Sequence, residues 1–146
     1  MKRGLFLLFA LAQVFNLCVS AQNVSKASPE KDELDIVFTD PLTGQLMSLS
    51  NKKKLRVLFV LDNTTVKADF RKLTTDTDLK SISKRDLSEI MGVKPKKIYA
   101  YRLLEGTQAT QLWGMAGADG VVDVISKPMY RSLKKEGLHD SYQLVK

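Results

Sequence analysis

Apolar and polar positions along this chain fall into short blocks whose spacing predicts a mixed α and β domain. The most nearly continuous apolar block after the first 21 residues is 55–61, which is typical of a central strand covered on both faces. Residues 97–104 and 121–126 are rich in β-branched, aromatic and long apolar side chains and predict two further strands. Between these blocks the apolar residues recur at helical spacing, so strands and helices should alternate from residue 55 onward.

Three helices are expected in that part of the chain. The first should begin after Ser83, whose side chain can accept a hydrogen bond from a free amide, and end at Gly92. The second should start at Gly106, and a short third one should cover residues 130–136 and end at Gly137. The residues expected to face the interior are Leu87, Ile90 and Met91 in the first helix, and Ala109, Leu112, Trp113 and Ala116 in the second.

The N-terminal part predicts a β-hairpin. Residues 34–38 and 46–49 read as two strands, and the turn cluster at 40–44 separates them. Residues 66–77 are ambiguous, with a short helix over 68–73 as one interpretation, and residues 142–145 predict an edge strand. Because each helical crossover favours parallel strands, we expect an α+β fold. It would be a small mixed β-sheet with packed helices, in which a hairpin precedes a β-α-β-α-β unit, all in a single domain over residues 34–146.

The first 21 residues predict a cleavable export signal. Lys2 and Arg3 precede an uncharged apolar run, and Val19 and Ala21 place the cut between Ala21 and Gln22. A membrane anchor is the alternative, but it needs about 20 apolar residues and this run is shorter. We therefore expect an exported protein without a transmembrane segment, located in the periplasm or at the outer membrane or cell surface, with a flexible leader over residues 22–33.

Cys18 is the only cysteine of the chain. Lipidation at Cys18 is an alternative, but Leu17 stands where lipoprotein signals carry a small residue. If the signal is removed after Ala21, the exported domain has no thiol and no disulfide.

The exported part is moderately basic. It retains 21 of the 23 basic residues and all 16 acidic ones, for a formal charge of +5. Two dense lysine clusters, at 52–54 and 94–97, could attract nucleic acid or lipid phosphates. Elsewhere in the chain, positively and negatively charged residues are interspersed, and no nucleic-acid-binding motif accompanies the lysines. We therefore interpret both clusters as solvated surface and expect no nucleic-acid partner.

Residues 101–127 carry a more specific pattern: a strand ending in Glu before Gly, a small-residue helix ending in Trp-Gly, a Gly-Ala-Asp-Gly turn and an apolar strand ending in Ser-Lys. This stretch resembles the plug domain of TonB-dependent outer-membrane receptors. Residues 58–63 are similar to the strand and turn that precede the motif in that family. The residues that carry the resemblance, with an expected structural role, are Gly106, Ala109, Trp113, Gly114, Gly117, Asp119 and Gly120.

The chain also departs from the family. Asn63, Trp113 and Asp119 replace the commoner Gly, Tyr and Asn, and Met115 replaces a small residue. We find no convincing TonB-box segment after Gln22 and no barrel after Lys127. The resemblance therefore implies a plug-like fold and an envelope setting, and we expect no transport by this chain alone.

No arrangement of residues in the sequence indicates catalysis, a metal or a cofactor. His139 is the only histidine and lacks partners at metal-ligand spacing. The acidic groups at 32–35 and 76–78 lack neighbouring aromatic residues that a glycosidase would use. Tyr99 and Tyr101 are candidate surface contacts, although packing in the core is the preferred interpretation.

The sequence thus favours a non-catalytic envelope protein, a stand-alone plug-like module that binds another envelope or outer-membrane protein. The alternative is a periplasmic protein that binds a small ligand or a glycan.

Overall fold

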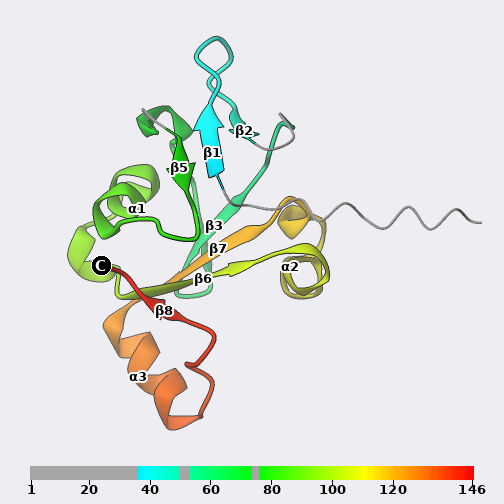
Figure 1. Ribbon diagram of the computed structural model, residues 1–146. Helices are drawn as coiled ribbons and strands as arrows, with labels where there is room; N and C mark the ends of the chain where they lie inside the picture. The colour runs from blue at the N-terminus through cyan, green and yellow to red at the C-terminus, as the bar shows by residue number, and fades with distance from the viewer. Residues whose placement is uncertain (1–35, 50–52, 74–75) are drawn as a thin grey trace, which may run out of the picture.

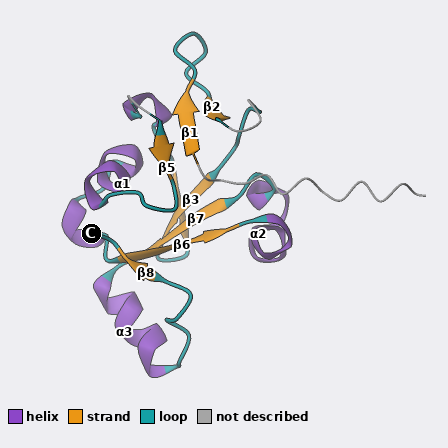
Figure 2. Cartoon of the chain, viewed as in Figure 1, coloured by secondary structure: helices purple, strands orange, loops and turns teal. Residues whose placement is uncertain are grey.

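The computed structural model describes residues 36–49, 53–73 and 76–146, and it confirms the α+β class. The predicted signal and leader lie outside the described residues. Two sheets and three α-helices form the structure of the described part (Figure 1, Figure 2). One sheet has the order β2-β1-β5, with β1 at Ile36–Thr39, β2 at Leu46–Ser48 and β5 at Thr77–Asp78.

The larger sheet has five strands in the order β4-β3-β7-β6-β8. Its strands are β3 (Leu58–Leu61), β4 (Thr64–Val66), β6 (Ala100–Leu104), β7 (Val121–Ile125) and β8 (Gln143–Leu144). The α-helices are α1 (Lys84–Met91), α2 (Gly106–Trp113) and α3 (Lys127–Lys135). The described residues also form three short 3₁₀ helices: η1 (Phe70–Lys72) before β5, η2 (Pro95–Lys97) before β6 and η3 (Gly114–Gly117) before β7.

The predicted N-terminal hairpin is present as β1 and β2, which pair in antiparallel fashion. Asp40 shapes its turn, because its carboxylate accepts hydrogen bonds from the Leu42 N–H at 3.0 Å and the Thr43 hydroxyl at 2.6 Å. Gly44, within the predicted turn cluster, has a positive φ of +63°, which glycine adopts without strain. The hairpin belongs to a separate sheet with β5, whereas the sequence predicted one mixed sheet.

A second hairpin, β3–β4, was not anticipated as a pair of strands. Asp62 and Asn63 occupy the left-handed region at φ 47° and 64°, which is the geometry of a two-residue turn between antiparallel strands. The sequence identified the turn but not the strand that follows it, because Thr64–Val66 is short and polar. In the described residues of the ambiguous segment after β4, the helical part is η1 alone.

Strand β7 is the centre of the five-stranded sheet and is buried along its whole length. On one face, Val122 and Val124 join the main core, which α1 and the three-stranded sheet also supply. On the other face, Val121 packs against Ala109 of α2. The two helices therefore cover opposite faces, on either side of the strands in Figure 1.

The pairing of β6 corrects the sequence prediction. A parallel β-α-β-α-β order was expected, but β6 is antiparallel to β7, with Leu104 opposite Val121. The chain reverses after α2, at Gly114 with φ +59°, and η3 returns beside the helix to the same end of the sheet. A crossover to the far end is therefore not made. The predicted parallel arrangement holds for β3 and β7.

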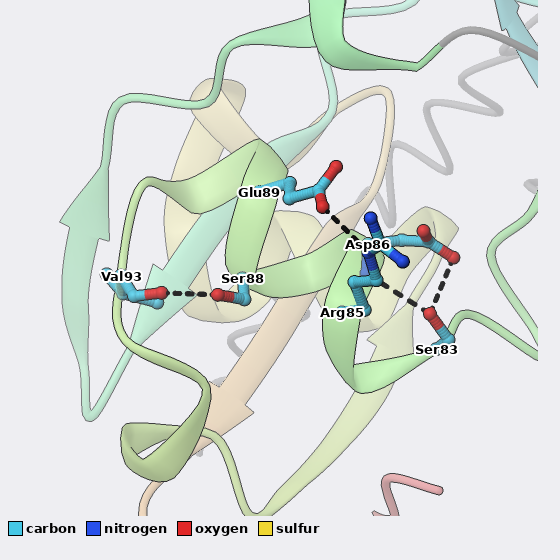
Figure 3. Close-up of polar contacts among 6 residues, drawn as sticks. All are labelled: Ser83, Arg85, Asp86, Ser88, Glu89 and Val93. Atoms are coloured by element: carbon cyan, nitrogen blue, oxygen red, sulfur yellow. Dashed lines mark hydrogen bonds and ion pairs between the residues drawn. The ribbon is translucent and has the colours of Figure 1, made fainter.

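Helix α1 forms as its sequence predicted, and Figure 3 shows the polar contacts at its ends. The Ser83 hydroxyl accepts the Asp86 N–H at 3.1 Å and donates to the Asp86 carboxylate at 2.7 Å. Gly92 ends the helix in the left-handed conformation, and the Ser88 hydroxyl donates to the Val93 carbonyl at 2.6 Å. Its three predicted apolar residues are all buried. Among the described residues, no helix has the length and apolar character needed to cross a membrane.

We predict that Gly117→Ala destabilises the protein by about 1–3 kcal/mol, because an added Cβ would lie 2.7 Å from the Ala109 carbonyl oxygen. Chemical denaturation measures the effect. Ala116→Ser, an addition of one atom at the exposed neighbouring residue, is the control and should change the free energy of unfolding by less than about 0.5 kcal/mol. Equal stability of the two variants would contradict the prediction.

Candidate functional site

A polar cluster occupies the face of the sheet that carries α2. Asp123, in the middle of β7, is 1% exposed. Its Oδ2 atom accepts hydrogen bonds from Arg102 Nε at 2.9 Å and from the Tyr142 hydroxyl at 2.7 Å. Arg102 stands directly opposite Asp123 in β6, so the strand register itself forms this ion pair.

Arg102 and Tyr142 also contact each other. The guanidinium carbon of Arg102 lies 4.5 Å from the centre of the Tyr142 ring, which is cation–π distance. Arg102 donates a longer hydrogen bond of 3.4 Å to the Ser141 hydroxyl. Burial raises the pKa of Tyr142, and the hydrogen bond to Asp123 raises this pKa further. The hydroxyl therefore stays protonated near neutral pH, which suits a structural donor better than a catalytic base.

This cluster fixes the C-terminal segment on the sheet. Tyr142 precedes β8, which pairs with Ala100 and Tyr101 of β6. The Val145 N–H donates to the Tyr99 carbonyl and the Lys84 N–H to the Lys146 carbonyl, both at 3.2 Å. The sequence predicted an edge strand here. The buried Asp123 that anchors it was missed, although an acidic residue within a β-branched run was a signal that could have identified it.

Two adjoining hollows lie beside the cluster, between α2 and the C-terminal segment. One has a volume of about 570 Å³ and the other about 350 Å³. They share four lining residues: Arg102, Leu103, Gln108 and Ser141. Together they form an open groove, called the α2 groove below, along the last three residues of β6.

The surface of α2 and η3 differs from the prediction. Ala109 is buried and Trp113 is partly buried, as expected. Leu112 and Ala116, which were expected to face the interior, are exposed, and the predictions for both are wrong. Gly117 of η3 occupies the space beside Ala109, so the sheet has no room for Ala116. Leu112 is 60% exposed, and Met115, three residues further along the chain, is 85% exposed.

The other glycines of the motif have local structural roles. Gly106, at the start of α2, has φ +53° and Gly120, before β7, has φ +104°. Asp119 fastens this turn to the segment before β3, because its carboxylate accepts the Arg56 N–H at 3.1 Å and pairs with Lys53 at 3.7 Å. This role of Asp119 was not visible in the sequence, since the partners are distant along the chain.

The two tyrosines proposed as surface contacts have separate environments. Tyr101 is buried in the main core, and its hydroxyl donates to the Lys80 carbonyl at 2.8 Å. The preferred interpretation of core packing is thus confirmed for Tyr101. Tyr99 is partly buried and its ring lies 5.1 Å from that of Tyr130 in α3. Neither tyrosine lines the α2 groove.

The remaining charged candidates do not converge. His139 packs edge-on against Tyr130 and lies 3.5 Å from Asp140. Asp76 and Asp78 line a shallow hollow near α1, where Arg85 pairs with Glu89 (Figure 3). Within residues 36–49, 53–73 and 76–146, no group of three or more His, Cys, Asp or Glu residues is placed to hold a metal ion.

No protein-family model, curated protein or solved structure matches this chain. The geometry of the described residues therefore carries the functional argument.

We predict that Tyr142→Phe lowers the free energy of unfolding by about 1–3 kcal/mol, because the buried Asp123 carboxylate loses a hydrogen-bond donor. Urea denaturation measures the change. Tyr130→Phe is the matched control, since the Tyr130 hydroxyl forms no hydrogen bond with the described residues, and it should shift stability by less than about 0.5 kcal/mol. Comparable losses in both variants would contradict the role assigned to Tyr142.

A pH dependence follows from the raised pKa of Tyr142. The folded state favours the protonated hydroxyl, so this contribution is complete below the pKa of an unfolded tyrosine, about 10, and is lost as the pH rises above it. We expect the wild-type stability to fall more steeply than that of Tyr142→Phe between about pH 10 and pH 12. Denaturation curves across this range provide the measurement, and parallel profiles would contradict it.

Proposed function

We propose that this protein is an exported, non-catalytic module of the cell envelope that binds another envelope protein through the surface of α2 and η3. The observation that carries the proposal is the exposure of Leu112 and Met115. Large apolar side chains that are left in water on two consecutive segments favour burial against a partner. The close packing of Gly117 against Ala109 and Val121 holds the segment that carries both side chains against the sheet.

The order of the elements supports the plug-like part of the proposal. Strand β6 ends just before Glu105-Gly106, α2 ends at Trp113-Gly114, a turn follows, and β7 leads to Ser126-Lys127. This is the sequence of features on which the resemblance to TonB-dependent receptor plugs depends. An envelope protein is therefore the class of partner that we propose.

Binding of a small ligand or a glycan is the second candidate. The larger hollow of the α2 groove favours it, because Lys80, Gln108 and Gln143 give this hollow a polar lining. A sugar ring commonly stacks on an open aromatic face, however, and Arg102 covers one face of the Tyr142 ring. A protein partner accounts for the exposed apolar residues as well, so it is the preferred function.

We predict that the double substitution Leu112→Ser and Met115→Ser weakens partner binding by about tenfold or more, since each buried apolar contact contributes about 1.5 kcal/mol or more. The measurement is affinity recovery from solubilised envelope with the full chain as bait, followed by quantitative mass spectrometry. Both residues are exposed, so thermal unfolding should be close to that of the wild type.

Leu42→Ser is the matched control. Leu42 is 93% exposed in the β1–β2 turn, which projects away from α2 in Figure 1. Its replacement should leave recovery of the partner unchanged. The proposal is contradicted if the wild type recovers no protein above background, or if the double variant recovers the same protein equally well. In either case a glycan array and small-ligand screening become the relevant tests.

A further inference from the structure

Strand β6 has one fully paired edge and one partly open edge. All five of its residues pair with β7, from Ala100 opposite Ile125 to Leu104 opposite Val121. On the other edge, β8 pairs with Ala100 and Tyr101 alone. Among the described residues, no strand lies beside the last three residues of β6, which are Arg102, Leu103 and Leu104.

The open part of this edge presents backbone groups. Antiparallel strands exchange hydrogen bonds at alternate residues, and the Val145 N–H bonds to the Tyr99 carbonyl. The same alternation directs the backbone N–H and C=O of Tyr101 toward Gln143 of β8. It directs those of Leu103 to the same side of β6, past the end of β8. Leu103 has no backbone partner on this side within the described part of the chain. Unpaired edge groups of this kind are a template for another strand.

The α2 groove runs along this open edge. Gln108, Gln111 and Leu112 of α2 form one wall, and Ser141, Tyr142 and Gln143 belong to the other side. The edge is thus recessed between a helix and the C-terminal segment. A single extended chain fits such a recess, whereas the sheet edge of a second folded copy would meet α2 and the C-terminal segment first.

The lining also indicates the chemistry of the occupant. Lys80 and Arg102 are balanced by Glu105 and Asp140, so the groove has no dominant charge. Leu103, Leu104 and Leu112 give it an apolar part beside the two glutamines. These features suit an uncharged segment with alternating apolar and polar side chains, because successive residues of a strand face opposite sides.

We propose that an uncharged extended segment of the partner protein adds to the open edge of β6 as a further strand, in line with β8 and beside α2. This inference rests on the proposed function and specifies how the partner is bound. Backbone hydrogen bonds to Leu103 provide the attachment, and the contact with Leu112 selects an apolar side chain. Strand addition joins the open edge and the exposed leucine into one binding surface.

The test uses the full chain and a displayed library of random peptides about eight residues long, which is a common strand length. Peptides selected on the wild type should show alternating apolar residues and little charge. Leu103→Pro removes the outward N–H and should weaken their binding by about tenfold or more, since a lost hydrogen bond in a bound complex is commonly of this size.

Thr65→Pro is the matched control at the other edge of the same sheet. The two-residue turn makes Leu61 and Thr64 exchange hydrogen bonds, so the N–H of Thr65 points outward as that of Leu103 does. This variant should bind the peptides within about twofold of the wild type.

Amide hydrogen exchange of the wild type, resolved by NMR, tests the proposal without any variant. This test remains valid if Leu103→Pro fails to fold. Bound peptide should slow exchange at Leu103 about tenfold or more and leave Thr65 unchanged. The proposal is overturned if no peptide is selected, if a folded Leu103→Pro binds equally well, or if bound peptide protects amides other than that of Leu103.

Protection of Leu103 in the absence of peptide that increases with protein concentration would assign the edge to a second copy instead. None of these results decides the proposed function, which the envelope-recovery experiment with the Leu112 and Met115 variant tests separately.

Discussion

The burial of β7 on both faces is the constraint that organises this structure. All five residues of β7 are inaccessible to solvent, so each face needs its own cover. The three-stranded sheet and α1 supply the large core on one side, and α2 supplies a smaller one on the other. On the side of the smaller core, the middle of the sheet face carries a polar residue, Asp123. Its burial is tolerated because Arg102 and Tyr142 donate hydrogen bonds to its carboxylate.

Asp123 therefore links the centre of the sheet to the end of the chain. A buried carboxylate without donors would destabilise the fold, and one of its two donors comes from the C-terminal segment. The same hydrogen bond holds β8 against β6. Since β8 covers only the first part of that edge, the interaction that stabilises the core also determines where the sheet stays open.

Local features of the fold were predictable because their causes lie close together in the sequence. Ser83, Gly92 and the apolar spacing between them suffice to define α1, and the Asp40–Gly44 cluster defines the first turn. The antiparallel placement of β6 was not predictable from the alternation of strands and helices. It depends on the reversal at Gly114 and on the contact between Gly117 and Ala109. The spacing of apolar residues along the sequence indicates neither of them. The partners of Asp119 and Asp123 likewise come from distant parts of the chain.

The same reversal shapes the surface of the candidate site. Because the chain turns at Gly114, η3 fills the inner position with the buried Gly117, and Met115 and Ala116 of η3 lie at the surface. A glycine there permits the close approach of the two segments, because an added Cβ would lie 2.7 Å from the Ala109 carbonyl oxygen. The open edge results from the short pairing of β8 with β6, and Leu112 of α2 lines the groove that runs along this edge, so the two features form one surface.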